Sequence, residues 1–152
     1  MRERKKSINR FEQMSNKLKE AGYKLTPQRM IILKILSERK DHPNPDAIYS
    51  AVIKQLPTTS PATVYKTLVL LKKINEVFEI SYSNESNRYD GVNPIQHPHI
   101  FCTKCKKFSD LDLLAYNKLL EEIELQTGYK VKNMSLFIEG ICPDCDGRTD
   151  GN

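Results

Sequence analysis

The chain has 152 residues, enough for one ordinary domain or two small ones, and no apolar run approaches the roughly 20 residues of a membrane-spanning helix. Its basic N-terminus lacks the apolar core of a signal peptide, so we expect a cytoplasmic protein with no membrane segment. The net charge is +5, but residues 1–95 carry +7 and residues 96–152 carry −2. This asymmetry favours a part that binds a polyanion, followed by a part with another task.

Four helices are predicted in the first half of the chain. The first spans residues 7–21, with Phe11, Met14 and Leu18 on one stripe, and Gly22 ends it. The next three each open with a polar N-cap residue and a proline, at residues 26–27, 44–45 and 60–61. The apolar residues expected to face inward are Met30, Ile32, Leu33 and Leu36 in the second helix, Ile48, Val52 and Leu56 in the third, and Val64, Leu68 and Leu71 in the fourth. The fourth helix is expected to end near Ile74.

A hairpin is predicted to follow the four helices. Residues 76–82 alternate and are rich in β-formers, residues 83–87 form a polar turn, and residues 88–90 return. Short helices followed by a hairpin are typical of a winged helix-turn-helix domain, which we assign to residues 1–90, with residues 91–96 as a linker.

The second half, residues 97–152, is predicted to be a small α+β domain. Strands are expected near residues 100–101 and 107–111, a helix over residues 114–126, and a last strand over residues 129–139. The whole chain is therefore expected to have an α+β fold, with a DNA-binding domain followed by a domain of another kind.

The fourth helix has the character of a DNA-reading helix. Its outer face presents Ala62, Thr63, Tyr65, Lys66 and Val69, and small residues at its start would let it enter a major groove about 12 Å wide. The hydroxyls of Ser60 and Thr63 can bond phosphate, Tyr65 can pack on a thymine methyl, and Lys66 can reach a guanine or a phosphate. A simply solvated helix face is the alternative, but the position directly before a hairpin favours DNA reading.

The four cysteines form two C-x-x-C pairs, Cys102 with Cys105 and Cys142 with Cys145. In a reducing compartment, such pairs separated by tens of residues indicate a zinc site before they indicate disulfides. Four thiolates close a tetrahedron around zinc and leave no open position, so the site is expected to be structural.

A second group of possible ligands lies just before the first cysteine pair. His97 and His99 are two residues apart and would point to one side of a strand, and Asp90 and Asp110 flank them. Imidazole mixed with carboxylate suits Fe(II) or Mn(II), which exchange more readily than thiolate-bound zinc. Two surface histidines are the alternative for an isolated pair. If His42, from the helical half, joins this group, metal binding would tie the two halves together.

Two enzymatic interpretations are weighed against a metal-binding regulator. A zinc hydrolase or deaminase needs a His-x-Glu beside Pro-Cys-x-x-Cys, whereas this chain has no His-x-Glu and its proline, Pro143, lies inside the second cysteine pair. A dithiol oxidoreductase built on Cys142 and Cys145 would need a thioredoxin-like βαβ pattern, which the surrounding sequence does not have. The sequence therefore predicts a protein that is not an enzyme.

Together these residues resemble the ferric uptake regulator (Fur) family of metal-dependent repressors. The resemblance extends from about residue 18 to residue 145, through LTPQR (25–29), HP (42–43), ATVYKTL (62–68), NRYD (87–90), HPHIFCTKC (97–105) and CPDC (142–145). It implies a winged helix followed by an α+β dimerisation domain. It also implies structural zinc on Cys102, Cys105, Cys142 and Cys145, and a regulatory Fe(II) or Mn(II) on His42, Asp90, His97, His99 and Asp110. Lys24 aligns with a basic residue that enters the minor groove, and Tyr65 with a base-contacting tyrosine.

Within this family the resemblance is nearest to the peroxide-responsive members. Asp110 stands where iron-responsive members usually have glutamate, and Gln96 stands where those members have a further histidine. The sequence departs from the family in two places: Asp90 and His97 are one residue further apart than in the peroxide sensors, and Lys106 replaces a common glycine.

We therefore expect a homodimeric repressor of a palindromic operator in double-stranded DNA. Peroxide would oxidise His42 or His97 when Fe(II) is bound, and the oxidised protein would leave the DNA. An iron-responsive uptake repressor that reports metal occupancy alone is the alternative within the family.

Overall fold

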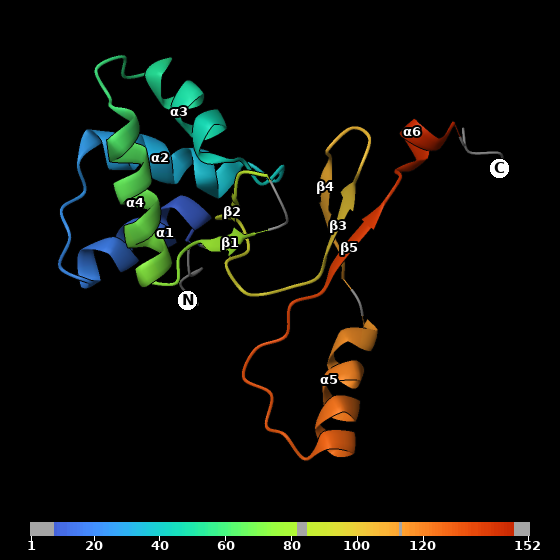
Figure 1. Cartoon of the computed structure of the whole chain (residues 1–152). Helices are drawn as coiled ribbons and strands as arrows, with labels where there is room; N and C mark the ends of the chain where they lie inside the picture. Colours follow the sequence, from blue (N-terminus) through green and yellow to red (C-terminus); the bar gives the residue numbers. More distant parts are fainter. Residues whose placement is uncertain (1–7, 82–84, 113, 148–152) are drawn as a thin grey trace, which may run out of the picture. The chain divides into compact units, whose positions relative to one another are not determined.

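The computed structural model describes residues 8–81, 85–112 and 114–147, and its elements are labelled in Figure 1. The chain divides into two compact units, Met1–Ile95 and Gln96–Asn152. None of the helices in the described ranges combines the length and the apolar character that a bilayer crossing requires.

The first unit contains four helices, α1 (Arg10–Glu20), α2 (Pro27–Glu38), α3 (Pro45–Ile53) and α4 (Pro61–Lys73). Thr26, Asn44 and Ser60 cap the last three of these, and each side chain accepts a hydrogen bond from the N–H three residues later. A proline follows each cap, where its missing N–H costs nothing. The three predicted helix starts are therefore confirmed.

The core of the first unit is formed by the inner faces of these helices. Its fully buried aliphatic residues are Met14, Leu18, Ile32, Leu33, Leu36, Ile48, Val52, Val64 and Leu71, with Leu68 1% exposed. The predicted stripe of α2 is wrong at Met30, which is 42% exposed, because at about 100° per residue the face centred on Leu33, Ile35 and Leu36 turns Met30 outward. Leu56 is only partly buried, because α3 ends at Ile53 before reaching it.

A two-stranded antiparallel hairpin completes the first unit. β1 (Phe78–Ile80) pairs with β2 (Arg88–Asp90), with Phe78 opposite Asp90. The first strand is shorter than predicted because Glu76 belongs to the turn that ends α4: its N–H donates to the Leu71 carbonyl at 2.9 Å. The predicted strand end at Tyr82 and the start of the predicted turn, residues 83–84, lie outside the described residues.

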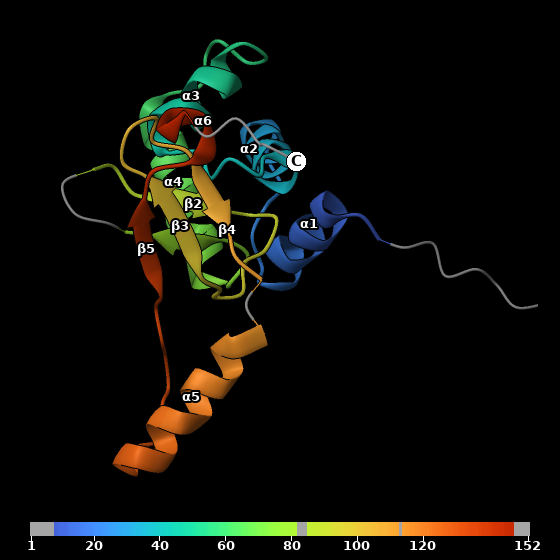
Figure 2. The ribbon, with the colours of Figure 1, turned by 90° about the vertical axis from the view of Figure 1, so that its right-hand side faces the viewer.

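The second unit is built on a three-stranded sheet in the order β4-β3-β5, seen in Figure 2. β3 (His99–Cys102) is central, antiparallel to β4 (Phe108–Asp110) and parallel to β5 (Phe137–Gly140). Phe101, Phe108 and Phe137 pack together, with ring centroids 5.3–6.2 Å apart. The helices of this unit are α5 (Leu114–Thr127) and the short α6 (Pro143–Asp146).

The strand predicted over residues 129–139 is wrong for most of its length. The strand in the structure, β5, spans Phe137–Gly140, so the prediction is right only over residues 137–139. Side chains of α5 bond the backbone of the intervening segment instead. Glu124 accepts from the Val131 N–H at 2.7 Å, and the Tyr116 hydroxyl donates to the Met134 carbonyl. The segment's backbone is thus partly satisfied without a neighbouring strand.

Candidate metal centres and nucleic-acid interface

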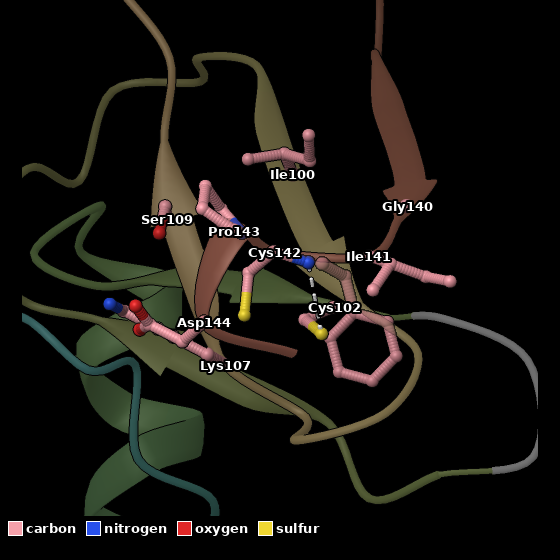
Figure 3. Close-up of a pocket in the computed structure, with 10 residues that line it drawn as sticks. Ile100, Cys102, Lys107, Ser109, Gly140, Ile141, Cys142, Pro143 and Asp144 are labelled. Atoms are coloured by element: carbon pink, nitrogen blue, oxygen red, sulfur yellow. Dashed lines mark hydrogen bonds between the residues drawn. The ribbon is translucent and has the colours of Figure 1, made fainter. Parts of the chain in front are cut away.

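The four cysteines come together at one end of the sheet of the second unit. Cys102 ends β3, Cys105 lies in the β3–β4 turn, Cys142 precedes α6 and Cys145 lies within α6. Their sulfur atoms all lie within 4.8 Å of one another. Figure 3 shows Cys102 and Cys142 beside a cavity of about 370 Å³ that both residues line.

The turn that holds Cys105 requires a left-handed residue. The Lys106 N–H donates to the Cys102 carbonyl at 2.9 Å, and the Cys102 N–H donates to the Lys107 carbonyl at 2.9 Å. This closure gives Lys106 a φ of 64°, a conformation that favours glycine. Lys106 therefore adopts the geometry that a glycine would supply without strain.

The cysteine spacing fits a metal ion and not a disulfide. The Cys105 and Cys142 sulfurs are 3.7 Å apart, and all four cysteines are free thiols. A zinc ion bonded to four sulfurs at about 2.3 Å would separate them by about 3.8 Å, whereas a disulfide bond is about 2.0 Å long. The donor set thus suits tetrahedral zinc.

The cysteines differ strongly in acidity. A hydrogen bond from the Cys142 N–H, at 3.3 Å, lowers the pKa of the Cys102 thiol to about 6. Hydrogen bonds with the thiols of Cys142 and Cys105 raise the pKa of Cys145 to about 12. One thiolate therefore forms readily and disfavours ionisation of the others, so a cation is needed to hold four thiolates together.

A second cluster in the same unit joins His97, His99 and Asp110. His99 and Asp110 face each other across β3 and β4. Asp110 Oδ1 lies 3.0 Å from Nε2 of His97 and 3.4 Å from Nε2 of His99. The two imidazole rings are 4.3 Å apart at their centroids. Two imidazole nitrogens and one carboxylate oxygen thus converge, as a divalent ion of intermediate hardness requires.

The first unit contains a matching pair, His42 and Asp90. Nε2 of His42 lies 3.3 Å from Oδ2 of Asp90, and each side chain is only 2% exposed. The other end of each side chain is fixed by the backbone. His42 Nδ1 lies 2.9 Å from the Lys40 carbonyl, which can only accept, so Nδ1 donates to it, and a neutral imidazole in this arrangement has its lone pair on Nε2. Asp90 Oδ1 accepts from the N–H groups of Val92 and Asn93, both at 2.9 Å.

Strand β2 and the loop that carries His42 are bonded to each other. The Tyr89 N–H donates to the Pro43 carbonyl at 3.1 Å, and the Arg88 guanidinium donates to the His42 carbonyl at 3.3 Å. His42 has a φ of 51°, unusual for a residue with a side chain. These backbone partners carry no signature in the sequence, so the sequence could name His42 and Asp90 but not what orients them.

Helix α4 presents the face that the sequence predicted. Tyr65 is 51% exposed and Val69 is 67% exposed, Ala62 and Lys66 are also exposed, and Thr63 is partly buried. The Ser60 and Thr63 hydroxyls lie 3.0 Å apart and share a hydrogen bond. Only one hydroxyl proton is used in that bond, so the other is available for a phosphate.

Lys24 is exposed in the loop before α2. The Arg29 guanidinium donates to its carbonyl at 2.7 Å and holds this loop against α2. No sequence pattern predicts this bond, because the carbonyl of residue 24 would accept in the same way whatever its side chain.

Comparison with known proteins identifies the family. The profile of the ferric uptake regulator family matches residues 20–139. This chain belongs to the ferric uptake regulator family. Its members are transcriptional regulators that respond to metal ions and are not enzymes, so the hydrolase and oxidoreductase interpretations are set aside.

This Fur-family chain is similar both to proteins named for their response to peroxide and to a protein named for ferric uptake. It is 33% identical over 138 residues to the peroxide-responsive repressor PerR of Staphylococcus aureus (strain USA300), which covers 91% of this chain and 93% of the relative. The structure resembles the Campylobacter jejuni peroxide stress regulator, with 32% identity, a TM-score of 0.66 and coverage of 86% and 94% of the two chains. It also resembles the Francisella tularensis ferric uptake regulator with iron, with 30% identity, a TM-score of 0.73 and coverage of 82% and 96%.

Proposed function

We propose that this Fur-family protein is a metal-dependent DNA-binding repressor that senses peroxide. The observation that carries the proposal is the convergence of His97 and His99 on Asp110, because a nitrogen and oxygen donor set suits Fe(II) or Mn(II). The identity of residue 110 as aspartate, and the similarity to proteins named for their response to peroxide, favour peroxide over iron as the signal.

Zinc is proposed to be structural and to occupy the cysteine cluster. The ligands would be Cys102, Cys105, Cys142 and Cys145, whose sulfur spacing and free-thiol state fit a closed tetrahedral site. Such a site has no open position for substrate or peroxide and would hold the sheet end and α6 together.

The regulatory ion is proposed to be ligated by residues of both units. The ligands would be His42 and Asp90 together with His97, His99 and Asp110. The donors of the first unit's pair, an imidazole and a carboxylate, are of the same kind as those of the second unit's cluster, and the bond from Nδ1 of His42 to the Lys40 carbonyl leaves Nε2 as the nitrogen that would ligate. An ion shared in this way would couple metal occupancy to the arrangement of the DNA-binding unit.

DNA is proposed to be bound by a homodimer, in the cytoplasm, at a palindromic operator. Tyr65 and Lys66 would reach base edges from α4, Ser60 and Thr63 would bond phosphate, and Lys24 would enter the minor groove. A two-fold dimer would place two α4 helices one helical turn apart on the duplex. Helix α5 supports a dimer, because none of its residues is fully buried and its Leu114 and Leu125 are 90% and 87% exposed.

Peroxide is proposed to act by oxidising His42 or His97. A bound Fe(II) would supply the chemistry that activates hydrogen peroxide. One oxygen atom of the peroxide would be inserted into a C–H bond of the imidazole, and the other would leave as water. The added oxygen would change the shape and basicity of the histidine, so this side chain would hold the ion less well and the repressor would leave the DNA.

The iron-responsive repressor remains the second candidate, favoured by the similarity to the Francisella tularensis ferric uptake regulator with iron. The two are separated by measuring operator binding with Mn(II) or Fe(II), before and after brief exposure to dilute peroxide. We expect the Fe(II) form alone to leave the DNA and to gain one oxygen on His42 or His97 by mass spectrometry.

Asp110→Glu provides the matched variant for this experiment. It keeps a carboxylate at the site but changes its reach, so metal-dependent DNA binding should persist while histidine oxidation falls. If the Fe(II) form of the wild-type protein stays on DNA with unmodified histidines, peroxide sensing is refuted and the iron-responsive repressor becomes the better account.

A further inference from the structure

Arg10, at the start of α1, bonds both ends of the β1–β2 hairpin. Its Nη1 donates to the Glu76 carboxylate at 2.7 Å and its Nη2 to the Glu76 carbonyl at 2.8 Å. Its Nε donates to the Gly91 carbonyl at 2.6 Å. Glu76 precedes β1 and Gly91 follows β2, so one guanidinium joins two points that a whole hairpin separates along the chain.

The side chains in this contact are well shielded from water. The Arg10 side chain is 18% exposed and that of Glu76 is 9% exposed. Arginine suits this position because its planar fork directs several N–H groups at fixed angles, which a lysine ammonium cannot reproduce. The contact is therefore specific in geometry as well as in charge.

Gly91 is also fixed from a second side. A Cβ atom at this position would lie 2.8 Å from the Cβ atom and from the carbonyl oxygen of Leu36, so α2 lies against the Gly91 backbone. Arg10 from α1 and Leu36 from α2 thus restrain the same peptide.

The restrained peptide directly follows Asp90, a proposed ligand of the regulatory ion. Asp90 Oδ1 is held by the N–H groups of Val92 and Asn93. The direction of these N–H groups depends on where Gly91 places the chain, and the same turn leaves Asp90 Oδ2 facing His42.

We infer that Arg10 is a positioning residue for the Asp90 carboxylate, acting through the Gly91 carbonyl. This inference rests on the proposed function, because it assumes that Asp90 ligates the regulatory ion. Without the Arg10 bond, the turn after β2 would sample other arrangements, and the ligand would be less well oriented before metal binds. Partners that orient a ligand in this way typically change metal affinity by about 10–100-fold when removed.

The test must separate positioning from general stability, because removing Arg10 alone would strand the buried Glu76 carboxylate. Glu76→Gln therefore serves as the background. It removes the carboxylate charge, while the Arg10 guanidinium keeps its bonds to the backbone carbonyls of residue 76 and Gly91. The double variant Arg10→Leu/Glu76→Gln then loses the bond to Gly91 without stranding a charge. Lys17→Met is the control on the same helix, since Lys17 pairs with Glu20 within α1 and the two side chains are 60% and 66% exposed.

The experiment uses full-length protein with its zinc retained and titrates it with Mn(II) and Co(II). The dissociation constant is measured for both ions, the visible absorption spectrum for Co(II), and the unfolding midpoint without the second ion. We expect about tenfold weaker binding in the double variant than in Glu76→Gln, and a changed Co(II) spectrum. Glu76→Gln and Lys17→Met should bind within about twofold of wild type.

Equal affinity and identical Co(II) spectra in Glu76→Gln and the double variant would overturn the inference, whatever the unfolding midpoints. A wild-type protein that binds no ion beyond its zinc would refute the proposed function, and the inference with it. A weaker affinity with an unchanged spectrum would also overturn it, since Arg10 would then contribute stability and not ligand geometry.

Discussion

The two candidate metal centres differ in chemistry and in how the chain supplies their ligands. The cysteine cluster draws all four donors from one unit, where two turns meet at the end of one sheet. The histidine and aspartate donors are divided, with His42 and Asp90 in the first unit and three others in the second. Soft thiolates and a closed site suit a permanent ion, whereas imidazole and carboxylate suit an exchangeable one.

The two kinds of site can therefore do different things. A site within one unit can stabilise that unit, but its occupancy reports little about the rest of the protein. Donors divided between units can link the occupancy of an ion to the state of a distant helix, which is what a metal-dependent regulator needs. The following variants separate effects on the cysteine site, on DNA binding, on the hairpin that carries Asp90 and on the exchangeable site.

The largest effect is expected for the cysteine cluster. Cys102→Ser or Cys145→Ser should lose most of the bound zinc and the folded dimer together, because a closed thiolate site contributes directly to folding. Zinc content by elemental analysis and dimer content by gel filtration measure the two losses. A variant that keeps a stable dimer and a full equivalent of zinc would show that these cysteines are not the structural ligands.

The next effect concerns the reading helix and should leave both donor sets intact. Tyr65→Ala should weaken operator binding by about 1–3 kcal/mol, if Tyr65 contacts a base, and should weaken binding to random DNA much less. Lys24→Ala is the contrast: it should weaken both and reduce the salt dependence by about one phosphate contact. Equal losses on both DNAs for Tyr65→Ala would mean that it only positions α4.

A pH effect is expected in the hairpin that carries Asp90. Burial raises the pKa of Glu79, but hydrogen bonds from Lys72, Tyr89 and Asn87 lower it further, so the pKa lies below its ordinary value. A lowered pKa means that Glu79 stabilises the fold above about pH 4.3, the pKa of an unfolded glutamate, and that this contribution is lost as the pH falls through the lower folded value.

Glu79→Gln should therefore destabilise the protein by about 1–2 kcal/mol at pH 7 and by progressively less below pH 4. Denaturant unfolding of wild type and variant at several pH values gives the difference directly. A difference that stays constant down to pH 3 would show that the Glu79 charge does not matter. Zinc content should not change at neutral pH.

The smallest effect is expected at Lys106, whose left-handed backbone costs roughly 1–2 kcal/mol for a residue with a side chain. Lys106→Gly would relieve this strain, but it would add disorder to the unfolded chain and remove an ammonium that lies 5.4 Å from the Phe101 ring. We expect a net gain of roughly 0.5 kcal/mol in thermal unfolding of the zinc form, with Mn(II) affinity unchanged. A clear loss of stability would mean that the ammonium contact outweighs the strain.

The parts of this fold that the sequence predicted best are those with local causes. An N-cap side chain followed by proline defines a helix start through contacts within four residues. Each of the three helices with this signal starts where predicted. The spacing within each cysteine pair, and that of His97 and His99, likewise indicates metal ligation from a few neighbouring residues.

The parts that failed depend on contacts distant in sequence. The segment before Phe137 has the composition of a strand, but side chains of α5 bond its backbone, so no periodicity could reveal its state. The contact of Arg10 with Glu76 and Gly91 spans 66 and 81 residues and has no signature in either segment. The left-handed conformation of Lys106 was signalled only by the resemblance, as a lysine in place of a glycine.

One exchangeable ion is proposed to be ligated by donors from both units. This proposal is tested by measuring the number and affinity of Mn(II) ions bound to zinc-loaded wild type, His42→Ala and His99→Ala. A single shared site predicts one tight Mn(II) per wild-type chain, and a loss of that same ion when either histidine is removed, with zinc unchanged. If one variant keeps the ion at wild-type affinity, or if each removes a different ion, the donors do not form one site.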